Sequence, residues 1–202
     1  MAGYSRWANI RHRLGALDSR PSAELASFLG QSPALSGQSV RFEGYGPGDA
    51  ALLIEAVTED RERTAAQLRR IFAAHGGYLG ASGSVAYLFN HVGLLTFAPG
   101  TPHEPLLGLA LEAGAEDVIV NDDGSIEVLT DPIELQSVRA ALVRAGFDPV
   151  DAEPTRRAAA AVKLTGAAAG ELLGLLAALA RVHHVRSVYT NAEISDEVLA
   201  SL

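Results

Sequence analysis

The chain has 202 residues, of which 48% are hydrophobic, and a formal net charge of −8. This composition excludes a disordered tail, and the length suits one large domain or two small ones. The absence of cysteine excludes disulfides and thiolate zinc sites, which fits a reducing compartment. No apolar run approaches the roughly 20 residues of a membrane span, and the opening residues are not those of a secretory signal. We therefore expect a cytoplasmic protein without membrane contact.

Positive charge is concentrated near the N-terminus. Residues 1–20 hold four arginines and one aspartate, a net charge of +3, which leaves −11 for the rest of the chain. The overall acidity argues against nucleic-acid binding, because affinity for phosphate comes mainly from Lys and Arg. The polarised distribution nevertheless leaves a basic arm that could contact phosphate. Ordinary solvated surface charge is the alternative interpretation.

The first 39 residues are interpreted as a basic arm followed by a connector rich in Ser, Pro and Gly. From residue 40, alternating apolar and polar residues predict a hairpin around a turn at residues 44–48, and then a helix that ends at two glycines, residues 76–77. A second hairpin is expected from the apolar segments 85–89 and 92–97.

A proline-rich stretch at residues 98–102 marks a boundary, and a compact lobe of residues 98–154 is expected to follow it. The lobe contains a helix, a hairpin and a second helix, for which Asp131 is the expected N-cap and Pro132 the first residue. After Pro154 the pattern predicts a strand, a helix and a strand over residues 158–164, 168–180 and 185–189.

These elements predict an α+β protein. A central α/β sandwich domain is expected from residues 40–97 and 155–202, because the last strand, helix and strand would complete its sheet. Residues 98–154 would be an inserted second α/β lobe, and residues 1–39 a truncated helical N-terminal arm.

Ordered blocks of residues across the chain resemble those of the YebC/PmpR family. Residues 1–13 (MAGYSRWANIRHR) resemble the family's opening MAGHSKWANI with its following basic residues, and residues 43–48 (EGYGPG) match the family's turn. Further matching blocks occur in the family's order at residues 63–64, 77–80, 82–89, 112–117, 130–132 and 188–191. The chain is therefore identified as a divergent member of this family.

The resemblance implies a helical N-terminal domain, a central α/β domain and an inserted α/β lobe. It also implies regulation of gene expression, since family members are described as DNA-binding transcriptional regulators and as ribosome-associated translation factors, including a mitochondrial translational activator of cytochrome oxidase. These roles share an RNA or DNA partner, need no cofactor and involve no enzymatic activity.

The chain departs from the family in its N-terminal domain. Only the connector, residues 18–39, stands where members carry several lysine-rich helices, and Tyr4 replaces the usual histidine. The alternative function is therefore a protein–protein interaction or oligomerisation module that has lost nucleic-acid binding.

The arm supplies most of the candidate nucleic-acid contacts. As a helix it would place Arg6 and Arg13 two turns apart on one face, with Trp7 on another. Guanidinium groups bind phosphates, and aromatic rings stack on exposed bases of structured RNA. Alternatively, Trp7 docks on the central domain and the arginines are solvated. The candidate residues are Arg6, Trp7, Asn9, Arg11, His12, Arg13 and, from the turn, Tyr45, which would either stack on a base or pack on the sheet.

Two glycine-rich segments invite comparison with anion-binding loops. Residues 44–48 lack the Gly-Lys-Ser/Thr ending of a phosphate loop and precede a strand, so we expect a tight turn with positive φ and close packing. Backbone amides of residues 75–84 could form an anion-binding nest, or could serve only turn chemistry. The candidate nest residues are Gly77, Gly80, Ser82 and Ser84. No spacing in the chain predicts a catalytic residue or a metal site.

Overall fold

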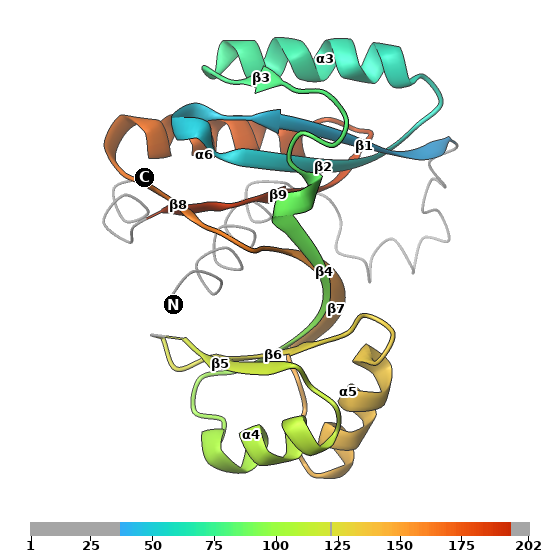
Figure 1. Cartoon of the computed structure of the whole chain (residues 1–202), viewed down its shortest axis with the longest axis vertical. Coiled ribbons are helices and arrows are strands. Elements are labelled where there is room, and N and C mark those ends of the chain that lie inside the picture. The colour runs from blue at the N-terminus through green and yellow to red at the C-terminus, as the bar shows by residue number, and fades with distance from the viewer. Residues whose placement is uncertain (1–36, 122, 195–202) are drawn as a thin grey trace. The chain divides into compact units, whose positions relative to one another are not determined.

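The computed structural model describes residues 37–121 and 123–194 of the chain. They form two compact units that each contain helices and sheet, so the predicted α+β class is confirmed (Figure 1). The first, called here the split unit, consists of residues 37–88 and 159–194, and the second, the inserted unit, consists of residues 89–158.

The split unit is built on a four-stranded antiparallel sheet with the strand order β3-β1-β2-β9. The unit also contains two α-helices and a separate parallel pair of short strands, β8 and β10. The elements are β1 (Gln38–Tyr45), β2 (Ala51–Thr58), α3 (Arg61–Ala74), β3 (Tyr78–Leu79), β8 (Val162–Leu164), α6 (Gly166–Ala180), β9 (Val185–Thr190) and β10 (Ala192–Ile194).

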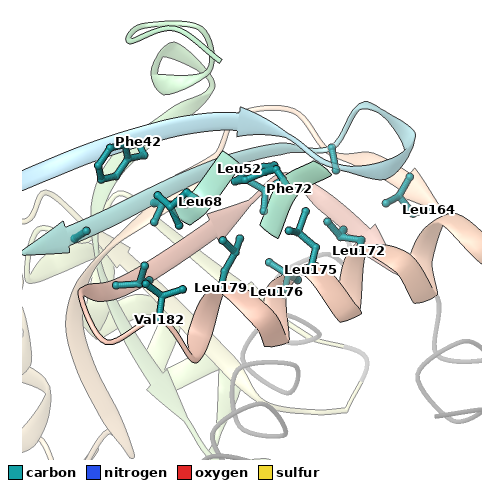
Figure 2. Packing of buried hydrophobic residues seen from close by; sticks show 14 of the residues in the cluster. Phe42, Leu52, Leu68, Phe72, Leu164, Leu172, Leu175, Leu176, Leu179 and Val182 are labelled. Carbon is teal, nitrogen blue, oxygen red and sulfur yellow. The ribbon is translucent and has the colours of Figure 1, made fainter. Parts of the chain in front are cut away.

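One face of this sheet packs against both helices. Apolar residues of α6 recur at the spacing of a single helix face and are buried with Leu68 and Phe72 of α3. Figure 2 shows these side chains converging between the helices and the strands that carry Phe42 and Leu52. Because side chains alternate along a strand, the odd-numbered residues 41, 43 and 45 of β1 project from the opposite face.

The turn between β1 and β2 depends on glycine. The backbone of Gly48 has φ 67°, and a Cβ on Gly44 would lie 2.8 Å from the Phe72 ring and 2.7 Å from the carbonyl oxygen of Tyr78. The amide of Gly46 donates to the carbonyl oxygen of Ala50 at 2.8 Å, which closes the turn. The expectation of a tightly packed turn rather than a phosphate loop is confirmed.

Asn191 joins the two halves of the split unit. Its side-chain Oδ1 accepts a hydrogen bond from the amide of Ala51 at 2.8 Å, and its carbonyl oxygen accepts one from the amide of Val162 at 2.8 Å. The side chain is buried, so these contacts link β2 with the segment that leads into β8. A buried amide in this position accounts structurally for the Asn at the end of the block at residues 188–191.

The inserted unit has the element order β-α-β-β-α-β and one antiparallel sheet with the order β5-β6-β4-β7. This is a ferredoxin-like topology. Apolar residues of both helices and of β4 and β6 form its core. The elements are β4 (Phe89–Phe97), α4 (His103–Glu112), β5 (Asp117–Val120), β6 (Ile126–Thr130), α5 (Leu135–Arg144) and β7 (Asp151–Ala158).

The prediction of a second hairpin from residues 85–89 and 92–97 is wrong. A single strand, β4, runs from Phe89 to Phe97, and it pairs with β6 and β7 instead of joining the sheet of the split unit. The residues before it, Ala86–Leu88, form a 3₁₀ turn instead, and the amides of Val85 and Ala86 donate to the side chain of Glu43. Residues 89–97 therefore lie in the inserted unit, although the sequence analysis groups them with the central domain.

Two further boundaries differ from the sequence analysis. Pro154, interpreted as a break, lies inside β7, where it pairs with Gly93. β7 is an edge strand, and an edge position tolerates the missing N–H of proline. The second helix of this unit begins at Leu135, because Asp131 accepts the amide of Ile133 in the preceding turn rather than capping the helix itself.

Replacing Gly44 with alanine should destabilise the split unit by about 1–3 kcal/mol, because the new methyl group overpacks a site bounded by backbone and an aromatic ring. Gly170→Ala in α6 is the matched control, since its Cβ would meet no atom within 4 Å, and it should stabilise the helix by up to about 1 kcal/mol. Urea unfolding of both variants measures the difference. Equal unfolding midpoints for the two variants would show that β1 has room for a side chain at residue 44.

Candidate nucleic-acid interface

The arm residues of the candidate interface lie outside the described residues. They are Arg6, Trp7, Asn9, Arg11, His12 and Arg13. The remaining candidates, Tyr45 and the loop after α3, are described and lie close together in the split unit.

The loop of residues 80–88 is held by the carboxylate of Glu43, which projects from the sheet face opposite the helices. Oε1 accepts a hydrogen bond from the amide of Gly83 at 2.8 Å, and Oε2 accepts two, from the amides of Val85 and Ala86, each at 2.8 Å. Glu43 is only 6% exposed. Burial by itself would raise the pKa of Glu43, but the three amide hydrogen bonds and nearby Arg41 outweigh it and hold the pKa below the usual 4.5.

Three of the four amides proposed for an anion-binding nest, those of Gly77, Gly80 and Ser84, are engaged within the chain. The amide of Gly77 donates to the carbonyl oxygen of Phe72 at 2.9 Å, that of Gly80 to the carbonyl oxygen of Glu43 at 2.8 Å, and that of Ser84 to Ala81 at 3.2 Å. The hydroxyl oxygen of Ser82 accepts a hydrogen bond from Arg61 at 3.3 Å. The loop does form a nest, but from other amides, and Glu43 occupies it.

Tyr45 stands beside this loop. Its hydroxyl donates to the carbonyl oxygen of Ser84 at 2.9 Å, and its ring centroid lies 5.3 Å from that of Tyr78, with the planes tilted by 31°. Burial raises the pKa of Tyr45, and Tyr87 and Tyr78, both close by, raise it further. Tyr45 is half-buried and packs beside Tyr78, while stacking of its ring on a base stays a prediction.

Tyr78 and Tyr87 are the residues that the sequence analysis missed. Their side chains are 59% and 73% exposed, among the most exposed large apolar side chains of the described residues. Tyr78 was treated as part of a turn, and Tyr87 as part of a buried strand that does not exist. Their proximity to Tyr45 depends on the folding of the loop onto β1, and no spacing in the sequence indicates it.

Two guanidinium groups lie near the same loop. Arg61 contacts Ser82 and lies 6.0 Å from the centroid of the Phe42 ring, while Arg41 is close enough to Glu43 to lower its pKa. Asp49, which lies beyond the end of β1, is close enough to Tyr45 to raise the pKa of its hydroxyl. Arg41 and Arg61 therefore lie beside the loop, and Arg41 stands opposite Glu55 in the pairing of β1 with β2.

The part of the chain that the structure describes contains neither a cluster of potential metal ligands nor a helix that could cross a membrane. Within residues 37–121 and 123–194, no three His, Asp or Glu side chains are grouped so that they could hold a metal ion. None of the helices described is both long and apolar enough to cross a membrane. His183 and His184 lie in a turn as an edge-to-face pair.

A buried carboxylate in the inserted unit was also missed. Glu127 of β6 is 1% exposed, and its Oε2 has no hydrogen-bond partner in the part of the chain that the structure describes. Burial raises the pKa of Glu127 to about 7, although Arg157 and Asn121 act to lower it. Perturbed carboxyl groups often mark functional sites, but the signal in the sequence is only one acid within an apolar strand.

Replacing Glu43 with glutamine should cost about 2 kcal/mol of stability at pH 7, because three amides would lose a charged acceptor. The depressed pKa of Glu43 means that this stability is present above pH 4.5 and is lost as the pH falls through the folded-state pKa. Thermal unfolding from pH 7 to pH 3 should show the gap between the two proteins closing. The exposed Glu59→Gln is the control, and a gap that is independent of pH would contradict this account.

Glu127→Gln should have the opposite pH dependence. Because burial raises the pKa of Glu127, the stability associated with its protonated form is full below pH 4.5 and is lost as the pH rises through about 7. At pH 8 the free energy of unfolding of the variant should be about 3 kcal/mol higher than that of the natural protein, and near pH 4 the two should differ little. Chemical unfolding at both pH values, with exposed Glu116→Gln as control, measures the effect; a variant less stable at pH 8 would refute it.

Comparison with known proteins identifies the family. A family model described as TACO1/YebC second and third domain matches residues 37–192. A protein of Methylococcus capsulatus, named probable transcriptional regulatory protein, is 38% identical over 247 aligned positions that cover all of both chains. One of Ralstonia nicotianae with the same name is 40% identical, covering 97% of this chain and 100% of that protein.

A solved structure agrees with these matches. The crystal structure of a conserved hypothetical protein from Aquifex aeolicus superposes with a TM-score of 0.70 and 35% identity, over 84% of this chain and 70% of that chain. The resemblance drawn from the residue blocks is therefore confirmed, and the chain belongs to the TACO1/YebC family, which the sequence analysis names YebC/PmpR.

Proposed function

We propose that this protein is a cytoplasmic regulator of gene expression that binds a nucleic-acid-containing partner and catalyses no reaction. The observation that carries the proposal is the surface formed by Tyr45 and the loop of residues 80–88, where aromatic side chains are accessible and Arg41 and Arg61 lie beside the loop. Relatives over the full length of the chain are named probable transcriptional regulatory proteins, which supports the same role.

A ribosome or other structured RNA is favoured over duplex DNA as the partner. The body of the chain carries a net charge of −11 against +3 in the arm, so phosphate attraction alone would be weak. A ribonucleoprotein offers shape, unpaired bases and protein contacts in addition to phosphate. In this proposal the arm residues Arg6, Arg11 and Arg13 contact phosphates, and Tyr45 contributes to a second contact surface.

A protein-interaction or oligomerisation module is the second candidate. The alignment with the Methylococcus relative spans 247 positions, whereas this chain has 202 residues, so the relative carries residues that this chain lacks. If the missing residues include most of the basic helices, nucleic-acid affinity could have been lost with them. A pulldown that recovers the same proteins after nuclease treatment, with no ribosomal RNA before it, would favour this candidate.

Sedimentation with ribosomes at graded salt tests the proposal. The intact chain should co-sediment at low salt, and replacing Arg6, Arg11 and Arg13 with alanine should weaken binding and reduce the slope of log K against log salt by about 2, from roughly 0.7 for each lost phosphate contact. The control replaces the exposed residues Arg69, Arg70 and Arg139 with alanine, which removes the same amount of charge from other parts of the chain.

Two results would refute the proposed function. One is failure of the intact chain to co-sediment, or to retard labelled RNA or DNA, at any salt concentration. The other is an equal effect of the two triple variants, because a general loss of positive charge would then explain the change without any specific contact by the arm.

A further inference from the structure

Three tyrosines of the split unit lie near one another. Tyr45 and Tyr78 are direct cross-strand partners of β1 and β3, and Tyr87 lies near enough to Tyr45 to influence its pKa. We call Tyr45, Tyr78 and Tyr87 the tyrosine platform. Tyr45 is the half-buried base of the platform, whereas Tyr78 and Tyr87 present most of their side-chain surface to solvent.

The platform is held in place before any partner binds. Glu43 fixes the amides of residues 83, 85 and 86, the hydroxyl of Tyr45 fixes the carbonyl of Ser84, and the amide of Leu88 donates to Val85 at 2.9 Å. Tyr87 therefore lies in a loop whose backbone is anchored both before and after it, and Tyr78 belongs to β3. Aromatic side chains on a preorganised backbone lose little conformational entropy on binding, which is a property of binding hot spots.

The charges around the platform favour a polyanion with unpaired bases as the occupant. Arg41 and Arg61 lie beside the loop that carries Tyr87. The ionised carboxylate of Glu43 is buried and turned toward three amides, and Glu43 and Asp49 are the acids close enough to raise the pKa of Tyr45. Bases could stack on the rings while the backbone runs along the side of the arginines, the arrangement used by single-strand binders.

We propose that Tyr78 and Tyr87, supported by Tyr45, form a stacking site for unpaired bases of single-stranded nucleic acid. This inference rests on the proposed function and specifies it further: the partner presents unpaired bases to the split unit, in addition to the phosphates contacted by the arm. Stacking on two rings tolerates any base sequence, because every base has a π-face.

Binding of a labelled oligouridine and of a labelled duplex to the full chain, measured by fluorescence anisotropy, tests the site. Tyr78→Ala/Tyr87→Ala should weaken binding of the single strand at least about tenfold, since stacking is worth about 1–3 kcal/mol for each base. Tyr78→Phe/Tyr87→Phe keeps the rings and should bind within about threefold of the natural protein. Ile133→Ala removes an exposed apolar side chain of the inserted unit and should change nothing.

Photocrosslinking provides a second measurement that needs no variant. An oligonucleotide containing 4-thiouridine, irradiated with the natural chain, should attach to peptides that contain Tyr78 or Tyr87. Crosslinks found solely in other peptides would overturn the site even if the alanine variant folds poorly.

The outcomes separate this site from the proposed function. If the double alanine variant binds the single strand as well as the natural chain does, while the arm variant is impaired, the stacking site is refuted and the proposed function survives. If the natural chain binds neither single strand, duplex nor ribosome, both are refuted. If the alanine variant loses only a nuclease-resistant protein partner, the platform is a protein contact and the inference is wrong.

Discussion

One buried carboxylate organises the surface on which the functional proposal depends. Glu43 places its negative charge against three backbone amides. Two of these amides, those of Val85 and Ala86, belong to the segment that precedes β4, which begins at Phe89. The same hydrogen bonds order the loop that carries Tyr87. They also stabilise the ionised form of the buried carboxylate, which lowers its pKa.

Much of the fold could be predicted because local patterns and long-range packing agree. The alternation in β1 and β2, the leucine periodicity of α6 and the glycines of the turn each require the structure that is observed. The second hairpin could not be predicted, since the segment from Val85 to Phe97 is apolar in two parts, and the sequence does not show that the amides of Val85 and Ala86 bind the distant Glu43. The boundary at Pro154 was mispredicted for a similar reason. A strand tolerates proline at its edge, and only the completed sheet shows that β7 is an edge strand.

The candidate site was less predictable than the fold. Tyr45 was singled out because it stands in a recognisable turn, whereas Tyr78 and Tyr87 gain their significance from neighbours about 30 to 40 residues away along the chain. The glycine- and serine-rich composition suggested a nest of amides, but it cannot show that the amides of Gly83, Val85 and Ala86 bind the protein's own Glu43. Glu127 was invisible for the same reason, because its burial is a property of the assembled sheet.

Under the proposed function, charged residues of the arm and aromatic residues of the split unit make different kinds of contact with the partner. An arm with a net charge of +3 attached to a body of −11 gains little from counterion release, so electrostatics can bring the partner close without holding it firmly. Stacking on rigid rings depends less on salt and on net charge, and it works best where the rings are already ordered. A family member with a shortened basic region would therefore draw a larger share of its affinity from the split unit, and the exposure of Tyr78 and Tyr87 on a loop fixed by Glu43 meets that requirement.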